Sequence, residues 1–275
     1  MRAIEFKKMH GLGNCFVMVD DRGGVVSGDL DEAALAVAVC DRNFGIGADG
    51  LILIRGSDVA DFEMKIVNED GSVAEMCGNG IRCFARYVKE EGITDSDELS
   101  IETGAGILRT WLLDDGRVRV DMGAPGLNSE DVAASGEGPV KVVEEERSFT
   151  FVSMGNPHAV AFVDSHDFDW RAEGSRVERA GSFPNRTNVE YVTLDGDREV
   201  TMKVWERGCG ETMACGTGAC AVAVAGVLEG RLEREPVTVH LPGGDLLIHW
   251  NDDGRVMMTG PAVTVCEGVY FHSLS

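Results

Sequence analysis

Two cysteines, each followed by Gly-x-Gly, are the residues of this chain best suited to chemistry. Cys77 opens the run Cys-Gly-Asn-Gly, and Cys215 opens the run Cys-Gly-Thr-Gly 138 residues further along. A thiolate is a good base near neutral pH when its surroundings lower its pKa. If two thiols face each other across one carbon atom, one removes a proton while the other delivers a proton to the opposite face. This is the chemistry that a two-base racemase or epimerase needs.

The two cysteines belong to an internal repeat. An ungapped offset of 138 between residues 64–118 and 202–256 gives 15 identities in 55 pairs. Ordinary composition gives roughly one identity in fifteen pairs by chance. Two halves with one architecture normally pack about a pseudo-twofold axis, so equivalent positions can face each other.

Each half is expected to be mostly strands around one helix. Phe62–Val67 and Val200–Trp205 are predicted strands that precede the two cysteines. After Cys77, apolar residues recur at helical spacing. After Cys215, the segment Ala219–Leu228 is apolar on nearly all sides, which predicts a buried helix. The fold class is therefore α+β.

The halves are expected to form two pseudo-symmetric, β-rich domains, each a barrel-like mixed sheet around its helix. We predict residues 1–120 for the first domain and 121–261 for the second, with 262–275 packing back onto the first. The boundary is expected near the glycine-rich and acidic stretch from Gly123 to Gly138.

Each cysteine is thus predicted at the start of a helix that strands enclose. A helix N-terminus stabilises a thiolate and lowers its pKa. The exposed backbone N–H groups of each Gly-x-Gly turn can hold a carboxylate.

Composition restricts the class of protein. The net charge of −22 argues against a nucleic-acid partner. Because the chain has no run of 18 apolar residues and no signal-peptide core at its start, we expect no membrane span and a cytoplasmic location. The eight cysteines are expected as free thiols, and no paired Cys/His spacing supports a zinc site.

Two other motifs carry alternatives. Gly216–Ala221 fits G-x-G-x-x-A, but Glu211–Ala214 before it is not the apolar strand that a nicotinamide dinucleotide site needs. His158, in Gly-Asn-Pro-His, could activate a cysteine for acyl transfer, which would leave the second cysteine without a task.

Glu206 and Arg207 follow an apolar strand, where a solvated ion pair is the ordinary interpretation. By the offset of 138, Glu206 corresponds to Asn68, and each lies nine residues before its cysteine. We therefore expect both at strand ends beside the pocket, where Arg207 can bind a carboxylate through two nitrogens.

Seven segments, in this order and spacing, resemble the diaminopimelate epimerases, a family of cofactor-independent amino-acid epimerases, over nearly the whole chain. The segments are Lys8–Asn14, Gly45–Gly50, Cys77–Cys83, Ser153–His158, Arg186–Asn188, Glu206–Gly208 and Ala214–Gly218. The resemblance implies an active site between two domains, no cofactor and no metal. It also implies interconversion of LL- and meso-2,6-diaminopimelate, a small-molecule substrate of lysine biosynthesis.

The resemblance further implies roles for individual residues. Cys77 and Cys215 would be the proton acceptor and donor, and His158 and Glu206 would tune the pKa of the two thiols. The residues implied in substrate binding are Asn14, Asn68, Gly78, Asn79, Asn156, Asn188, Glu206, Arg207, Gly216 and Thr217.

Four positions depart from the family pattern: Cys15, Gly50, Cys209 and Cys266. A homodimer is the candidate assembly. At the position of Cys266 the family often has an aromatic residue that makes the usual dimer contact, so this chain lacks that side chain.

The residues alone leave two rival functions. A proline or hydroxyproline racemase uses related two-cysteine chemistry but needs no groups for a distal amino acid. A small-molecule binding or metal-storage protein would exchange no hydrogen at a substrate α-carbon.

Overall fold

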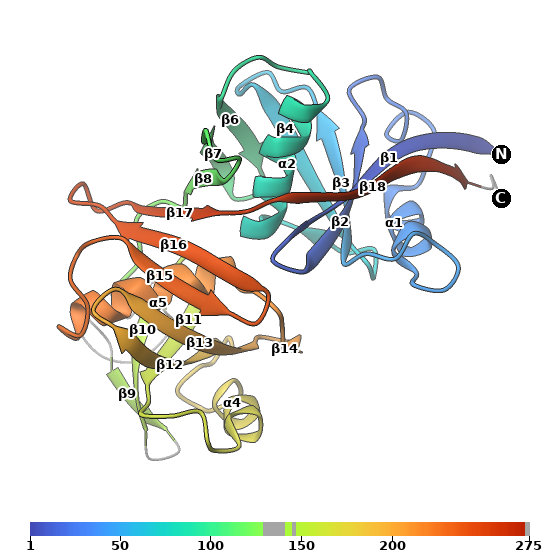
Figure 1. The fold of residues 1–275 in the computed structure, drawn as a ribbon. Helices are drawn as coiled ribbons and strands as arrows, with labels where there is room; N and C mark the ends of the chain where they lie inside the picture. Colours follow the sequence, from blue (N-terminus) through green and yellow to red (C-terminus); the bar gives the residue numbers. More distant parts are fainter. Residues whose placement is uncertain (129–140, 145–146, 273–275) are drawn as a thin grey trace. The chain divides into compact units, whose positions relative to one another are not determined.

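The computed structural model describes residues 1–128, 141–144 and 147–272, which fall into two compact units. The N-terminal unit comprises Met1–Val120 together with the C-terminal segment from Gly260, and the C-terminal unit comprises Asp121–Thr259. Figure 1 labels the elements of both.

The N-terminal unit is a mixed sheet around one helix. Its elements are β1 (Arg2–Gly11), β2 (Asn14–Asp20), α1 (Glu32–Cys40), β3 (Gly50–Arg55), β4 (Phe62–Asn68), β5 (Val73–Ala74), α2 (Gly78–Glu90), β6 (Glu98–Thr103), β7 (Gly106–Leu112) and β18 (Val263–His272), and β8 (Val118–Asp121) runs to its boundary. The strands lie in the order β18-β1-β2-β3-β4-β6-β7-β8, with β2–β3 and β4–β6 parallel and the other neighbours antiparallel. Helix α2 packs against β1, β2, β3 and β7.

The C-terminal unit repeats this plan. Its elements are β9 (Lys141–Glu144), β10 (Arg147–Ser153), β11 (Pro157–Phe162), α4 (Trp170–Val177), β12 (Asn188–Gly196), β13 (Glu199–Glu206), β14 (Gly210–Glu211), α5 (Gly216–Leu228), β15 (Val237–Leu241), β16 (Gly244–Trp250) and β17 (Val256–Gly260). The order is β9-β10-β11-β12-β13-β15-β16-β17, and the parallel pairs, β11–β12 and β13–β15, fall at the same places as before. The predicted α+β class is confirmed.

The two central helices show why this sequence forms them. Helix α5 contacts β10, β11, β12, β13, β15 and β16, so its residues from Gly218 to Gly226 are all buried. This explains the apolar character of the segment on every side. Both helices end before a glycine with positive φ, Gly92 at 63° and Gly230 at 67°, a conformation that glycine adopts without steric strain.

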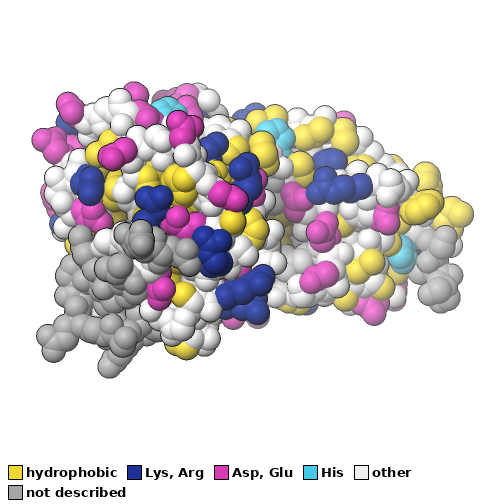
Figure 2. All heavy atoms as spheres, turned by 90° about the horizontal axis from the view of Figure 1, so that it is seen from below, with side chains coloured by type: hydrophobic (Ala, Val, Ile, Leu, Met, Phe, Trp, Pro, Cys, Tyr) yellow, Lys and Arg dark blue, Asp and Glu magenta, His cyan; other side chains and the backbone are white. Residues whose placement is uncertain are grey.

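Among the helices in the described ranges, none has the length and apolar character needed to cross a bilayer. On the face shown in Figure 2, acidic side chains are scattered, and Lys and Arg side chains lie among them. The net charge of −22 is therefore not gathered into one acidic patch on this face.

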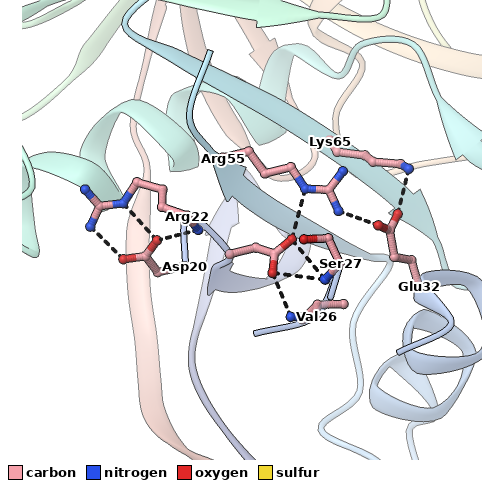
Figure 3. A network of polar contacts seen from close by, with 8 residues as sticks. Asp20, Arg22, Val26, Ser27, Glu32, Arg55 and Lys65 are labelled. Atoms are coloured by element: carbon pink, nitrogen blue, oxygen red, sulfur yellow. Dashed lines mark hydrogen bonds and ion pairs between the residues drawn. The ribbon is translucent and has the colours of Figure 1, made fainter. Parts of the chain in front are cut away.

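A polar network fastens the loop after β2 to the sheet of the N-terminal unit (Figure 3). Asp21, whose side chain is 0% exposed, accepts the backbone N–H groups of Val26 at 2.7 Å and Ser27 at 3.1 Å. Arg55 Nε donates to the same carboxylate at 2.9 Å, and Arg55 also pairs with Glu32 of α1. Burial raises the pKa of Asp21, but these donors outweigh burial and leave the pKa below its ordinary value of 3.8.

Replacing Asp21 with Ala is expected to lower the free energy of unfolding by about 3 kcal/mol, because two buried N–H groups and Arg55 lose their acceptor. Since folding lowers the pKa of Asp21, its contribution is complete above pH 3.8 and is lost as the pH falls toward the folded-state pKa. Urea unfolding at several pH values measures both effects.

The control is Asp20→Ala. Asp20 pairs with Arg22 at 2.7 Å, but both side chains are more than a third exposed. Its loss should therefore change the free energy of unfolding by less than about 1 kcal/mol. If the two variants lowered the free energy of unfolding equally, the buried network of Asp21 would stabilise the fold no more than an exposed ion pair.

Candidate active site

Cys77 occupies the N-cap position of α2, with an extended backbone at φ −142°. Its thiol lies 3.5 Å from Asn14 Oδ1, to which it can donate. The same oxygen accepts a hydrogen bond from Asn79 Nδ2 at 3.4 Å. The N-terminal unit therefore brings three of the predicted site residues together at the start of its central helix.

Asp49, which the sequence analysis did not single out, fixes Asn14. Its Oδ2 accepts from Asn14 Nδ2 at 3.0 Å and from the backbone N–H of Cys15 at 2.7 Å, and Arg42 binds Oδ1 at 2.8 Å. Because the carboxylate holds the amide nitrogen, the amide oxygen of Asn14 points to the thiol of Cys77. The only sequence signal was an acidic residue inside the segment Gly45–Gly50.

Arg82 is a second residue that the sequence analysis missed. It is fully buried, and its guanidinium donates to the carbonyl of Gly78 at 3.0 Å and to Asn79 Oδ1 at 2.8 Å. A third bond, 3.1 Å long, reaches the carbonyl of Pro261. The bonds to Gly78 and Asn79 fix the first turn of α2. Asn68, at the end of β4, is turned to its own loop and donates to Ser72 Oγ at 2.9 Å.

Cys215 occupies the equivalent N-cap position of α5 and is buried. Its sulfur accepts the backbone N–H of Gly218 at 3.4 Å and lies 3.6 Å from Thr217 Oγ1. Asn156 Nδ2 donates to that hydroxyl at 3.3 Å. Gly216 is the first, buried residue of α5, as Gly78 is of α2.

His158 is fully buried behind this helix start. Its Nε2 lies 3.0 Å from Asn156 Oδ1, and its Nδ1 lies 2.7 Å from Glu190 Oε1. One ligating atom each of His158, Glu190 and Cys215 lies within 4.8 Å of the others. The sequence analysis named His158 but missed Glu190, whose signal was one acidic residue in the apolar run Val189–Val192 of β12.

The electrostatics of Cys215 run against the expectation from the helix start alone. Burial, followed by the charge of Glu206, raises the pKa of this thiol well above its ordinary value of 9.0. The hydrogen bonds from Thr217 and Gly218 only partly oppose this rise. Burial likewise raises the pKa of Glu190, and the neighbouring His158 opposes it. These effects favour the protonated form of Cys215.

Asn188 and the residues after β13 form the rest of the predicted set. Asn188 is buried; its Nδ2 donates to the carbonyl of Pro157 at 3.0 Å, and its Oδ1 accepts the backbone N–H of Arg207 at 2.9 Å. Glu206 accepts a hydrogen bond from Thr212. The guanidinium of Arg207, on an exposed residue, donates to the carbonyl of Asn185 at 3.3 Å. Asn188 thus acts by fixing the backbone of Arg207.

Among the described residues, His158, Glu190 and Cys215 form the one group of ligating side chains close enough to hold a metal ion. Imidazole and thiolate suit zinc. However, Nδ1 of His158 and Oε1 of Glu190 already bind each other at 2.7 Å, so a metal ion would have to break that contact.

Comparison with known proteins identifies the family. A family model described as Diaminopimelate epimerase matches residues 6–127 and 150–265. The chain belongs to the diaminopimelate epimerase family. A diaminopimelate epimerase of Desulfitobacterium hafniense is 53% identical over 277 residues, covering 97% of this chain and 98% of the relative. That of Moorella thermoacetica is 54% identical over 277 residues, covering 96% and 98%. The family predicted from the seven segments is confirmed.

Solved structures resemble this diaminopimelate epimerase family member in fold. A PhzF-family phenazine biosynthesis protein of Bacillus anthracis has a TM-score of 0.74 at 18% identity, covering 99% of this chain and 100% of that chain. A hydroxyproline epimerase of Agrobacterium vitis has a TM-score of 0.68 at 15% identity, covering 98% and 91%. At such identities the likeness concerns the fold alone.

The two helix starts of this diaminopimelate epimerase family member differ chemically. At Cys77, Asn14 turns its amide oxygen, an acceptor, to the sulfur, and Asp49 holds the amide in this orientation. At Cys215, the backbone N–H of Gly218 is a donor and the hydroxyl of Thr217 can become one. Donors stabilise a thiolate, so these two groups partly offset the burial and the charge of Glu206 that raise the pKa of Cys215.

Gly218→Ala is expected to lower the free energy of unfolding by about 1–3 kcal/mol through overpacking. A Cβ at this position would lie 2.7 Å from Glu190 Oε1 and 3.1 Å from Cys215 Sγ. Urea unfolding measures the change. Gly181→Ala is the control, because a Cβ there has nothing within 4 Å; if Gly218→Ala were as stable as this control, the packing of Glu190 against Cys215 would be loose.

Proposed function

We propose that this protein interconverts LL- and meso-2,6-diaminopimelate by a two-base mechanism in which Cys77 and Cys215 exchange roles. The observation that carries the proposal is the pair of cysteines at the N-caps of the two central helices, in two copies of one architecture. Relatives that are more than half identical over nearly their whole length bear the name diaminopimelate epimerase.

The backbone N–H groups at the two helix starts supply the electrostatic part of the mechanism. Gly78 with Asn79, and Gly216 with Thr217, lie in the first turns of α2 and α5. Amides at a helix N-terminus bind anions, so we assign the α-carboxylate of the substrate to them. These groups also stabilise the negative charge that develops when the α-proton leaves, which replaces the electron sink of a cofactor.

Proton transfer follows from the resting states of the thiols. Cys215 holds its proton, because burial and then the charge of Glu206 raise its pKa. When Cys77 is a thiolate and Cys215 is a thiol, Cys77 takes the α-proton and Cys215 delivers its own proton to the opposite face. The Cys215 thiolate that results is stabilised by the donors Thr217 and Gly218. The reverse reaction starts from that thiolate.

Selectivity for a substrate with two amino-acid ends requires a second carboxylate site. We assign the distal carboxylate to Arg207, whose backbone Asn188 holds. From the family resemblance, we assign Asn68 and Glu206 to the distal ammonium group. A cyclic amino acid has no such distal group. We also propose the cytoplasm as the location and a homodimer as the assembly.

The decisive experiment is deuterium incorporation at the substrate α-carbon, followed by NMR in D₂O with reductant. LL-diaminopimelate is offered in one sample, and L-proline and trans-4-hydroxy-L-proline are offered in others. We expect exchange and epimerisation of diaminopimelate alone. Exchange with the cyclic amino acids alone would assign the two-thiol chemistry to the rival reaction, and no exchange with any substrate would favour a binding protein.

Cys77→Ala and Cys215→Ala are each expected to lower kcat for epimerisation by at least about 10²- to 10⁴-fold, the usual worth of a positioned acid or base. Cys266→Ala is the matched control, because Cys266 is an exposed residue of β18. Near-normal epimerisation by Cys215→Ala would refute the two-base scheme.

Arg207→Leu is expected to raise KM for diaminopimelate by about 10- to 100-fold, because a charged hydrogen-bond partner of the distal carboxylate is lost. Arg171→Leu is the control, since this exposed arginine pairs with Glu211 on the surface. An unchanged KM in Arg207→Leu would place the distal carboxylate elsewhere.

A further inference from the structure

Glu190 is a buried carboxyl group to which neither the family resemblance nor the mechanism above assigns a specific task. It lies in β12 with 0% exposure, and its Oε1 is 2.7 Å from His158 Nδ1. Its other oxygen, Oε2, is buried and has no hydrogen-bond partner among the residues that the structure describes. A buried anionic oxygen without a partner is costly, whereas the neutral carbonyl oxygen of a protonated carboxyl group costs much less.

The internal repeat shows that the fold does not require this polar pair. The offset of 138 places Ile52 at the position of Glu190. A Cβ on Gly80 would lie 2.9 Å from Ile52 Cδ1, just as a Cβ on Gly218 would lie 2.7 Å from Glu190 Oε1.

His158 has an apolar counterpart in the same way. Phe16 pairs with Gly50 at the start of β3, as His158 pairs with Asn188 at the start of β12. One unit thus fills the space behind its helix start with Phe16 and Ile52, and the other fills it with an ionisable pair. Because an apolar pair satisfies the same architecture, the polar pair points to function.

A chain of hydrogen bonds leads from Glu190 to the sulfur of Cys215. After Glu190 and His158 come Asn156, 3.0 Å from His158 Nε2, and Thr217, 3.3 Å from Asn156 Nδ2; the Thr217 hydroxyl ends the chain 3.6 Å from the sulfur. All members of the chain belong to the C-terminal unit.

The direction of this chain depends on one proton. Asn156 turns Oδ1 to His158 and Nδ2 to Thr217, so His158 Nε2 carries a hydrogen. With Asn156 donating to its oxygen, the Thr217 hydroxyl is left to donate to sulfur. The remaining proton lies between His158 Nδ1 and Glu190 Oε1. If it stays on Glu190, His158 is neutral and its tautomer is fixed.

We propose that Glu190 is a positioning residue that keeps a proton, donates it in a hydrogen bond to His158 Nδ1, and so directs the chain that presents the Thr217 hydroxyl as a donor to Cys215. The proton stays on Glu190 throughout, and no bond to it breaks during turnover. The charged or titratable groups that face the pair are Cys215 and Glu206. Burial and the charge of Glu206 both favour the protonated carboxyl group.

Two substitutions separate a protonated carboxyl group from a charged one. Glu190→Gln keeps an N–H donor for His158 Nδ1 and should retain kcat close to that of the wild type. Glu190→Leu leaves His158 without its partner and should lower kcat by about 10- to 100-fold, by analogy with the loss of a carboxylate that orients a metal-bound histidine. KM should stay nearly constant in both variants, because Glu190 does not touch the substrate.

Controls address folding. Glu173→Gln changes another buried glutamate, which lies on α4 and pairs with Arg147 at 2.7 Å. This variant should leave kcat unchanged. The double variant His158→Phe with Glu190→Ile copies the apolar pair of the N-terminal unit. It should unfold at a urea concentration no lower than that of Glu190→Leu while its kcat falls at least as far, which separates loss of the chain from loss of the fold.

A direct readout is the ¹⁵N NMR spectrum of His158 in histidine-labelled protein, assigned with His158→Phe. We expect the neutral Nε2–H tautomer near neutral pH in the wild type and in Glu190→Gln. An imidazolium, the Nδ1–H tautomer, or equal loss of kcat in Glu190→Gln and Glu190→Leu would overturn the proposal, as would wild-type kcat in Glu190→Leu.

The kinetic part of this inference rests on the proposed function, but the NMR part does not. If the wild type failed to exchange the α-hydrogen of diaminopimelate, the proposed function would fail, and the tautomer of His158 would still decide where the proton of the buried pair lies.

Discussion

Each unit depends on enclosing an entire helix within a mixed sheet. Enclosure satisfies the apolar sides of α2 and α5, but it does nothing for the backbone N–H groups of their first turns, which have no partner inside the helix. Those groups must meet something polar at the end of the helix. In both units a cysteine occupies the N-cap and a glycine is the first helical residue. The thiol therefore lies beside the backbone N–H groups of the first helical turn. The other polar residues of each site lie around this helix start.

The two sites use this constraint differently. At Cys77 the polar chain ends in Asp49, a partly exposed carboxylate that also binds Arg42, so its charge is compensated. At Cys215 the corresponding chain ends in Glu190, a fully buried carboxyl group that contacts His158 and whose pKa is raised by burial. The same backbone therefore supports one thiol that faces an acceptor and another that faces donors.

Local patterns predicted the fold class, the buried helices and the family, because each leaves a signal within a short segment or in a fixed offset. Val200–Trp205 alternates as a strand should, and the apolar segment after Cys215 can only be an enclosed helix. Asp49, Arg82 and Glu190 could not be found in this way. Their roles come from contacts between residues far apart in sequence, such as Arg82 with Pro261 or Glu190 with His158. The sequence around an acidic residue in a strand does not show which residue it will pair with. The helix start alone also predicts the wrong direction for the pKa of Cys215, because burial and the charge of Glu206 act on it more strongly.

The apolar pair Phe16 and Ile52 and the polar pair His158 and Glu190 occupy matching places in the two units, and this has a consequence for how the two halves can diverge. Behind Cys77, substitutions are limited only by volume, so Leu, Met or Val in place of Ile52 keeps the space filled. Behind Cys215, our proposal for Glu190 adds a second requirement, because a substitute must also donate a hydrogen bond to His158 Nδ1. The N-terminal half can therefore accumulate neutral changes at a position where the proposed role of Glu190 holds the C-terminal half fixed.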